Sequence, residues 1–111
     1  MEFPERAARN EELFRSINER IEKGAEHHDV RGPIPFHCEC DRTSCLATID
    51  LPLAVYERLL GERYQFVVIP GHEDAAIERV LESEPAYLVV EKIGEARAQI
   101  DRDHPQQRHH D

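Results

Sequence analysis

The first quarter of the chain carries apolar residues at helical spacing, with charged residues between them. The apolar positions recur every three or four residues: Leu13, Phe14, Ile17, Ile21 and Ala25. Because residues three or four apart share one face of an α-helix, the pattern predicts a long amphipathic helix over residues 4 to about 26. We expect this face to pack on its own domain; the alternative is contact with a second copy of the chain or another partner.

Two short segments that follow a polar connection have the pattern of strands. Residues 36–40 form a short, bounded segment after the breaker Pro35, and residues 45–50 alternate between apolar and polar side chains. The polar residues 41–44 between them suit a turn. We therefore predict a β-hairpin whose turn comprises residues 41–44.

The next part of the chain carries a helix signal and then a strand signal. Pro52 begins a predicted short helix that ends near Gly61. Its apolar face consists of Val55, Tyr56, Leu59 and Leu60. Residues 64–69 form a nearly continuous apolar run, which is typical of a central strand covered on both sides.

The last apolar segments favour a second hairpin. Residues 86–92 predict a strand. Residues 74–83 are ambiguous, because Ala76, Ile77, Val80 and Leu81 fit a helical face. Residues 80–83 could instead open a hairpin through Glu84 and Pro85, and we favour the hairpin. From Gly94 onward the chain becomes polar. Together these elements predict an α+β fold in which the long N-terminal helix packs on a small, mainly antiparallel sheet.

The length and composition fit one small domain. The chain has 111 residues, of which 40% are hydrophobic and none is Trp, so its core is modest and would gain from extra stabilisation. We expect residues 1–103 to form a single domain and residues 104–111 to form a disordered tail. The tail carries His104, His109 and His110, whose metal binding we interpret as incidental.

The charge disfavours two classes of partner. Asp and Glu number 23 against 14 Lys and Arg, and the net charge of −9 repels nucleic-acid phosphates and anionic lipid headgroups. No apolar run approaches the ~20 residues that a membrane-spanning helix needs. The charged stretch of residues 1–23 is unlike a signal peptide. We expect a cytoplasmic protein with neither a nucleic-acid nor a membrane partner.

The three cysteines and one histidine are the chemically informative residues. Cys38 and Cys40 flank a single residue, and Cys45 follows after four more. An odd number of cysteines, two of them too close to pair, argues against a disulfide framework. Alternate residues of a strand face the same side, so Cys38 and Cys40 can point together while Glu39 points away, and a turn can return Cys45 beside them.

The fourth ligand is expected from a turn further along the chain. Residues 69–72, with Pro and then Gly in the middle, have the signature of a type II turn that would hold His72 in a defined direction. Three thiolates and an imidazole are a typical ligand set for structural zinc, so the sequence predicts a Zn²⁺ site at Cys38, Cys40, Cys45 and His72. The alternative is a set of buried thiols without metal.

Other candidate residues are interpreted as secondary. His37 should face away from Cys38 on the strand, whereas His27 and His28 lie on a connection from which they could reach the site. The acidic residues that flank the motif are expected to be solvated: Glu39, Asp41, Glu73 and Asp74.

A closed set of four ligands leaves no position for a catalytic water, so we expect no enzymatic activity. The predicted function is a non-catalytic, zinc-stabilised binding or regulatory module with a protein partner. A homodimer through the first helix is one form that this contact could take. The alternatives are a thiol redox sensor that uses zinc-bound cysteines and, less favoured, a small metalloenzyme.

The chain resembles a group of small bacterial proteins and domains with no established activity. The resemblance spans roughly residues 9–92 and centres on the patterns F-x-C-E-C-x4-C, P-G-H-E and V-V-E-K. It is carried by Arg9, Asn10, Glu11, Phe14, Arg15, Asn18, Glu19, Phe36, Cys38, Glu39, Cys40, Cys45, Tyr56, Glu57, Phe66, Pro70, Gly71, His72, Glu73, Glu78, Val80, Val89, Val90, Glu91 and Lys92. The resemblance implies no catalytic residue, but it implies that the Cys and His residues form one unit.

Overall fold

The structure, a computed structural model, describes residues 4–42 and 44–103. The described chain contains eight elements in this order: α1 (Pro4–His27), β1 (Ile34–His37), β2 (Thr48–Leu51), α2 (Leu53–Leu60), β3 (Gln65–Val68), β4 (Glu78–Ser83), β5 (Leu88–Lys92) and α3 (Gly94–Asp103). The fold is α+β, as predicted. The predicted tail, with its three histidines, lies outside the described residues.

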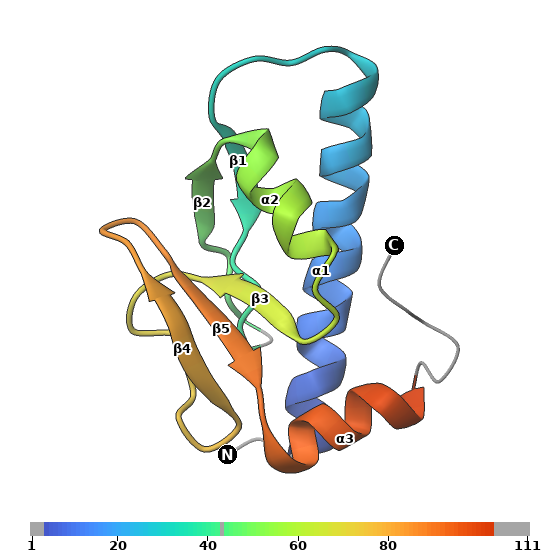
Figure 1. Ribbon diagram of the computed structural model, residues 1–111, viewed down its shortest axis with the longest axis vertical. Coiled ribbons are helices and arrows are strands. Elements are labelled where there is room, and N and C mark those ends of the chain that lie inside the picture. Colours follow the sequence, from blue (N-terminus) through green and yellow to red (C-terminus); the bar gives the residue numbers. More distant parts are fainter. Residues whose placement is uncertain (1–3, 43, 104–111) are drawn as a thin grey trace.

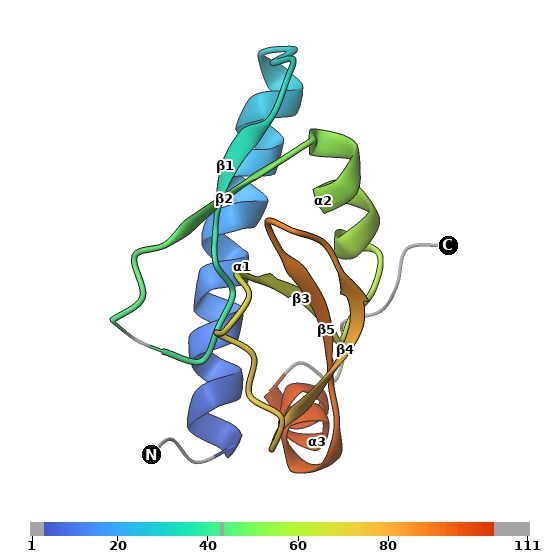
Figure 2. The ribbon, with the colours of Figure 1, turned by 90° about the vertical axis from the view of Figure 1, so that its left-hand side faces the viewer.

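The strands form two antiparallel sheets. β1 pairs with β2 in a two-stranded ribbon, and β3, β5 and β4 form a three-stranded sheet with β5 in the centre. The long helix α1 runs along the long axis of the molecule, with the ribbon and α2 beside one half and α3 beside the other (Figure 1). Figure 2 shows the ribbon beside α1, with the three-stranded sheet on another side of the molecule.

The predicted strand over residues 64–69 is present, but it is not central. β3 lies at the edge of its sheet, yet the side chains of Phe66, Val67 and Val68 are buried. The free edge is met by residue 39, whose N–H donates to the Val67 carbonyl oxygen at 2.7 Å. The apolar run therefore indicated burial correctly, while the covering segment comes from another part of the chain.

The first hairpin has different bounds from those predicted. β1 ends at His37 and β2 begins at Thr48, so the connection spans residues 38–47 instead of 41–44. The Cys38 N–H still donates to the Ala47 carbonyl at 3.0 Å, but the next residue turns to β3. The chain thus leaves the ribbon to bridge the two sheets, which strand patterning alone does not predict.

The buried face of α1 differs from the predicted stripe. Phe14 and Ala25 are buried as expected, whereas Leu13 is 59% exposed and Ile17 is 40% exposed. Asn18 is fully buried instead. The helix is turned so that a hydrogen-bonding residue faces the domain, because the polar backbone beneath it must be satisfied.

The second half of the chain confirms the favoured hairpin and adds a helix. β4 and β5 pair in antiparallel register, and the Glu84 N–H donates to the Tyr87 carbonyl oxygen at 2.9 Å in the connecting turn. The polar stretch after Lys92 forms α3, which was not predicted. α3 packs on α1 and buries Ala96, Gln99 and Ile100. Within the described residues, no helix combines the length and the apolar character that a membrane crossing requires.

Candidate metal centre

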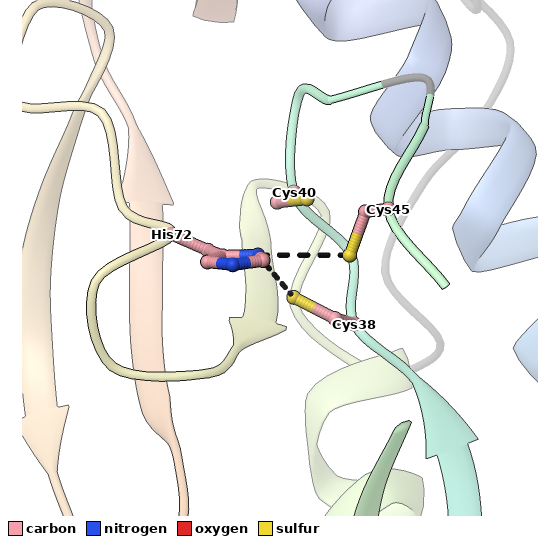
Figure 3. A group of neighbouring side chains, drawn as sticks. All are labelled: Cys38, Cys40, Cys45 and His72. Atoms are coloured by element: carbon pink, nitrogen blue, oxygen red, sulfur yellow. Dashed lines mark hydrogen bonds between the residues drawn. The ribbon is translucent and has the colours of Figure 1, made fainter. Parts of the chain in front are cut away.

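The four predicted ligands converge in one place. The Sγ atoms of Cys38, Cys40 and Cys45 and a ring nitrogen of His72 all lie within 4.8 Å of one another. The His72 Nδ1 is 3.7 Å from the Cys38 Sγ and 3.6 Å from the Cys45 Sγ. Figure 3 shows the imidazole reaching toward the sulfurs from a separate loop.

These distances fit a shared cation. Zinc binds sulfur at about 2.3 Å and imidazole nitrogen at about 2.0–2.1 Å, which places S and N about 3.6 Å apart in a tetrahedron. The two measured S···N separations agree with that value. All three cysteines are free thiols, and all are buried. The cluster can therefore hold a metal ion and contains no disulfide.

The segment that carries Cys38 and Cys40 is fixed by its bridge between the sheets. The backbone N–H of Cys38 is hydrogen-bonded to the carbonyl oxygen of Ala47, just before β2. The N–H of residue 39 is hydrogen-bonded to the carbonyl oxygen of Val67 in β3. The two ligands lie beyond β1, so the strand alternation that we used to predict their common direction does not extend over them. The bridge to both sheets, instead of a regular strand, sets that direction.

Cys45 returns to the site through a tight turn. Its N–H donates to the Arg42 carbonyl oxygen at 3.1 Å. The Arg42 guanidinium in turn donates to the Gly71 carbonyl oxygen at 3.0 Å. This contact joins the cysteine loop to the segment that carries His72.

The predicted type II turn is present and orients His72. The His72 N–H donates to the Ile69 carbonyl oxygen at 3.0 Å, and Gly71 has a φ of 97°, a conformation that side chains other than hydrogen disfavour. The Gly71 N–H also donates to Glu73 Oε1 at 2.7 Å. The turn is therefore held by its own backbone hydrogen bond and by the side chain of Glu73, and it presents the imidazole to the sulfurs.

Backbone N–H groups face the sulfurs. The Ile69 N–H donates to the Cys38 Sγ at 3.3 Å. A hydrogen bond from Cys38, supported by the backbone at Arg42, lowers the pKa of Cys40 to about 4, although burial opposes this shift. The same sulfur–sulfur contact and burial raise the pKa of Cys38, and burial raises the pKa of Cys45.

Glu39 is buried, not solvated as expected. Its side chain is 0% exposed, and both carboxylate oxygens are hydrogen-bonded. Oε2 accepts from the Tyr56 hydroxyl at 2.5 Å and from Asn18 Nδ2 at 3.0 Å, while Oε1 accepts from the Val67 N–H at 3.0 Å. Burial raises the pKa of Glu39, and Arg15 and these donors oppose the rise. Glu39 does point away from the sulfurs, but that side of the segment is the protein interior.

Asp41 is also buried, contrary to expectation. Burial and the neighbouring Asp74 raise the pKa of Asp41 to about 6, while Lys92 lowers it. Lys92 forms a buried ion pair with Glu78, whose other oxygen accepts from the Asp74 N–H at 2.8 Å. Of the four flanking acids, Glu73 is exposed as expected and Asp74 is partly buried.

The rival histidines lie outside the cluster. His37 stacks on Phe14 with ring centroids 4.1 Å apart, as its predicted opposite direction requires. Its Nδ1 lies 2.6 Å from the Cys38 carbonyl oxygen and its Nε2 lies 3.0 Å from that of Cys45, so it supports the backbone of two ligands. His27 and His28 are exposed and pack edge to face on each other.

A second group of potential metal ligands consists of carboxylates only. Oxygens of Glu22, Glu26 and Glu57 lie within 4.8 Å of one another between α1 and α2. A hydrogen bond with Glu22 raises the pKa of Glu57. Acidic side chains often gather without an ion between them, so we assign no ion to this group.

Sequence reasoning missed the residues that support the site. Asn18 and Tyr56 lie 21 and 17 residues from Glu39 along the chain, and no local pattern connects them. A possible signal was a polar position inside an apolar helical stripe, which Asn18 occupies. Comparison with known proteins adds no further assignment, because no protein-family model, curated protein or solved structure matches the chain.

Proposed function

We propose that the protein is a non-catalytic binding or regulatory module whose fold is stabilised by one Zn²⁺ held by Cys38, Cys40, Cys45 and His72. The observation that carries the proposal is the separation of the His72 Nδ1 from two sulfurs, 3.6 and 3.7 Å, which matches a tetrahedral zinc centre. Thiolate and imidazole ligands in a tetrahedral arrangement favour zinc. Iron–sulfur clusters of the common types use four cysteines, and this chain has three.

A structural role follows from where the ligands lie. They come from the segment after β1, the loop before β2 and the turn after β3, so a bound ion would join the ribbon to the three-stranded sheet. Structural zinc contributes about 10–16 kcal/mol of apparent binding free energy in small peptides, against about 5–15 kcal/mol of net stability for a whole domain. The ion would therefore add strongly to the stability of the segments that it joins.

Four protein ligands also support a non-catalytic role. A catalytic zinc ion usually has three protein ligands and keeps a fourth position for water or substrate. Here four candidate ligand atoms already lie within 4.8 Å of one another, which supports a site closed by protein ligands.

The exposed side of α1 is where we expect a protein partner. Leu13 and Ile17 are exposed apolar side chains one helical turn apart. Apolar side chains that face solvent together are a common feature of interaction sites. The partner is another protein or a second copy of this chain.

Elemental analysis tests the metal directly. The untagged protein, purified without added metal, should contain about one zinc and no iron per chain. Two variants serve as controls: Cys45→Ser should abolish binding, and Arg31→Ala, which changes an exposed residue away from the site, should leave it intact. A folded wild-type chain without metal would overturn the proposal in favour of buried thiols.

A thiol redox sensor is the second candidate, favoured by the three free thiols, whose sulfur atoms lie within 4.8 Å of one another. In that mechanism two ligand thiolates and one hydrogen peroxide, with two protons, give a disulfide and two waters, and zinc is released. The burial of all three sulfurs opposes rapid attack. Stoichiometric zinc release by one equivalent of peroxide, reversed by a reductant, would favour the sensor, and inert thiols would eliminate it.

A further inference from the structure

Glu39 contacts the edge of β3 through both its backbone and its side chain. Its N–H donates to the Val67 carbonyl oxygen at 2.7 Å, and its carboxylate Oε1 accepts from the Val67 N–H at 3.0 Å. The carboxylate thus takes the place that a backbone carbonyl occupies in a β-ladder. This pair of bonds fixes the residue between Cys38 and Cys40 against the edge of β3.

The other carboxylate oxygen ties the same residue to both neighbouring helices. Oε2 accepts from Tyr56 on α2 and from Asn18 on α1. Asn18 Nδ2 also donates to the His37 carbonyl oxygen, and Asn18 Oδ1 accepts from the His37 N–H, at 2.7 Å each. His37 immediately precedes Cys38, the first proposed ligand. The cysteine segment is therefore held from a strand and from two helices.

Burial of a carboxylate costs solvation free energy. An apolar side chain of similar volume would avoid the loss of solvation, so stability alone does not favour a charged group here. What the carboxylate adds is direction, because its acceptors match donors on three separate elements. A residue that fixes the backbone between two ligands reduces the ordering that metal binding must otherwise impose.

We infer that Glu39 is a positioning residue of the metal centre, which holds the backbone between Cys38 and Cys40 so that both sulfurs face His72 before the ion binds. The inference rests on the proposed zinc site and deepens it. Glu39 itself points away from the ion and acts through the two cysteines. Supporting residues of this kind typically change metal affinity by about 10–100-fold when they are altered.

Glu39→Gln is the main test. Glutamine has nearly the same shape, but its amide NH2 would face either the Val67 N–H or the Tyr56 and Asn18 donors, so one side of the contact is lost. We expect the zinc dissociation constant, measured by competition with a chromophoric chelator, to rise about tenfold or more. With Co²⁺ as the probe, the thiolate-to-metal and ligand-field bands should also change in shape.

Two further variants separate positioning from general stability. Ile100→Ala removes a buried side chain on α3, which carries no ligand, so it should destabilise the fold and leave both zinc affinity and the Co²⁺ spectrum unchanged. Tyr56→Phe removes one donor and keeps the ring that stacks on Phe36 at 4.4 Å. It should weaken zinc binding in the same direction as Glu39→Gln, and it decides the question if that variant does not fold.

The outcomes distinguish this inference from the proposed function. A wild-type protein that takes up neither zinc nor cobalt overturns the proposed zinc site. A wild-type protein that binds zinc, with Tyr56→Phe and any folded Glu39→Gln binding as tightly as Ile100→Ala, overturns only the positioning role. Weaker binding together with altered cobalt bands in the Glu39 and Tyr56 variants, but not in Ile100→Ala, supports it.

Discussion

The ligand-bearing part of the molecule and the three-stranded sheet are held together in different ways. The segments around the cysteines and His72 contain short turns and few regular elements, whereas β3, β5 and β4 form a continuous antiparallel sheet with Val67, Val89 and Val90 fully buried. Apolar burial, strand pairing and the buried Lys92–Glu78 ion pair keep the sheet ordered. The ligand segments depend on single hydrogen bonds and, in our proposal, on the ion. We therefore expect the ligand segments to open more easily than the three-stranded sheet.

Removal of metal should produce the largest effect and should expose this difference. After chelation, we expect amide hydrogen exchange to accelerate around Cys38, Cys45 and His72, while the central strand β5 stays protected. The physical reason is that local opening follows local contacts, and the ligand segments would lose the ion that joins them. His72→Ala should reproduce the pattern without a chelator. Equal loss of protection in β5 would mean that the two regions unfold as one.

The buried ion pair of the sheet provides the converse test. Lys92→Met leaves Glu78 buried without its partner, which should cost about 3–5 kcal/mol in the free energy of unfolding measured with denaturant. Zinc content should stay near that of the wild type, because the ligands belong to other segments. Arg79→Ala is a matched control on the same strands, since it breaks an exposed pair with Glu91 and should cost at most about 1 kcal/mol.

The two regions also differ in how far the sequence predicted them. The clustering of the three cysteines with His72 and the type II turn at His72 could be predicted because cysteine spacing and a Pro-Gly pair are local signals. The bounds of β1 and the inward direction of Glu39 could not be predicted. They depend on Val67, 28 residues away, and on α1.

The sheet and helices show the same limit in another form. The apolar run at β3 predicted a buried strand, but its place at the sheet edge depends on what covers it. α3 was missed because only Ala96 and Ile100 among its buried residues are apolar, too few for a recognisable stripe. Helix formation there depends on packing against α1, which no local pattern encodes.

A smaller effect is expected where the two ligand segments touch. Arg42→Ala removes the hydrogen bond to the Gly71 carbonyl and should lower the free energy of unfolding of the zinc-loaded protein by about 0.5–1.5 kcal/mol. Its zinc dissociation rate, followed by transfer to a chelator, should rise because the His72 turn is less restrained. Arg31→Ala, which breaks only an exposed contact with Asp29, should change neither quantity. Identical dissociation rates for the two variants would show that the turn needs no external support.

The smallest effect on stability is expected at the exposed face of α1. Leu13→Glu and Ile17→Glu should change the free energy of unfolding by no more than about 0.5 kcal/mol, because neither side chain is buried. Phe14→Ala, one position along the same helix, should cost about 3–5 kcal/mol, since Phe14 is buried against His37.

Sedimentation of the same variants tests whether this face is covered by a second copy of the chain. If the wild type is a dimer through α1, the glutamate variants should sediment as monomers, because buried charges of like sign would face each other across the interface. A monomeric wild type would exclude the homodimer and leave the face to a different protein. A large loss of stability in Leu13→Glu at concentrations where the wild type is monomeric would contradict the exposure of Leu13 and would restore the helical stripe that the sequence predicted.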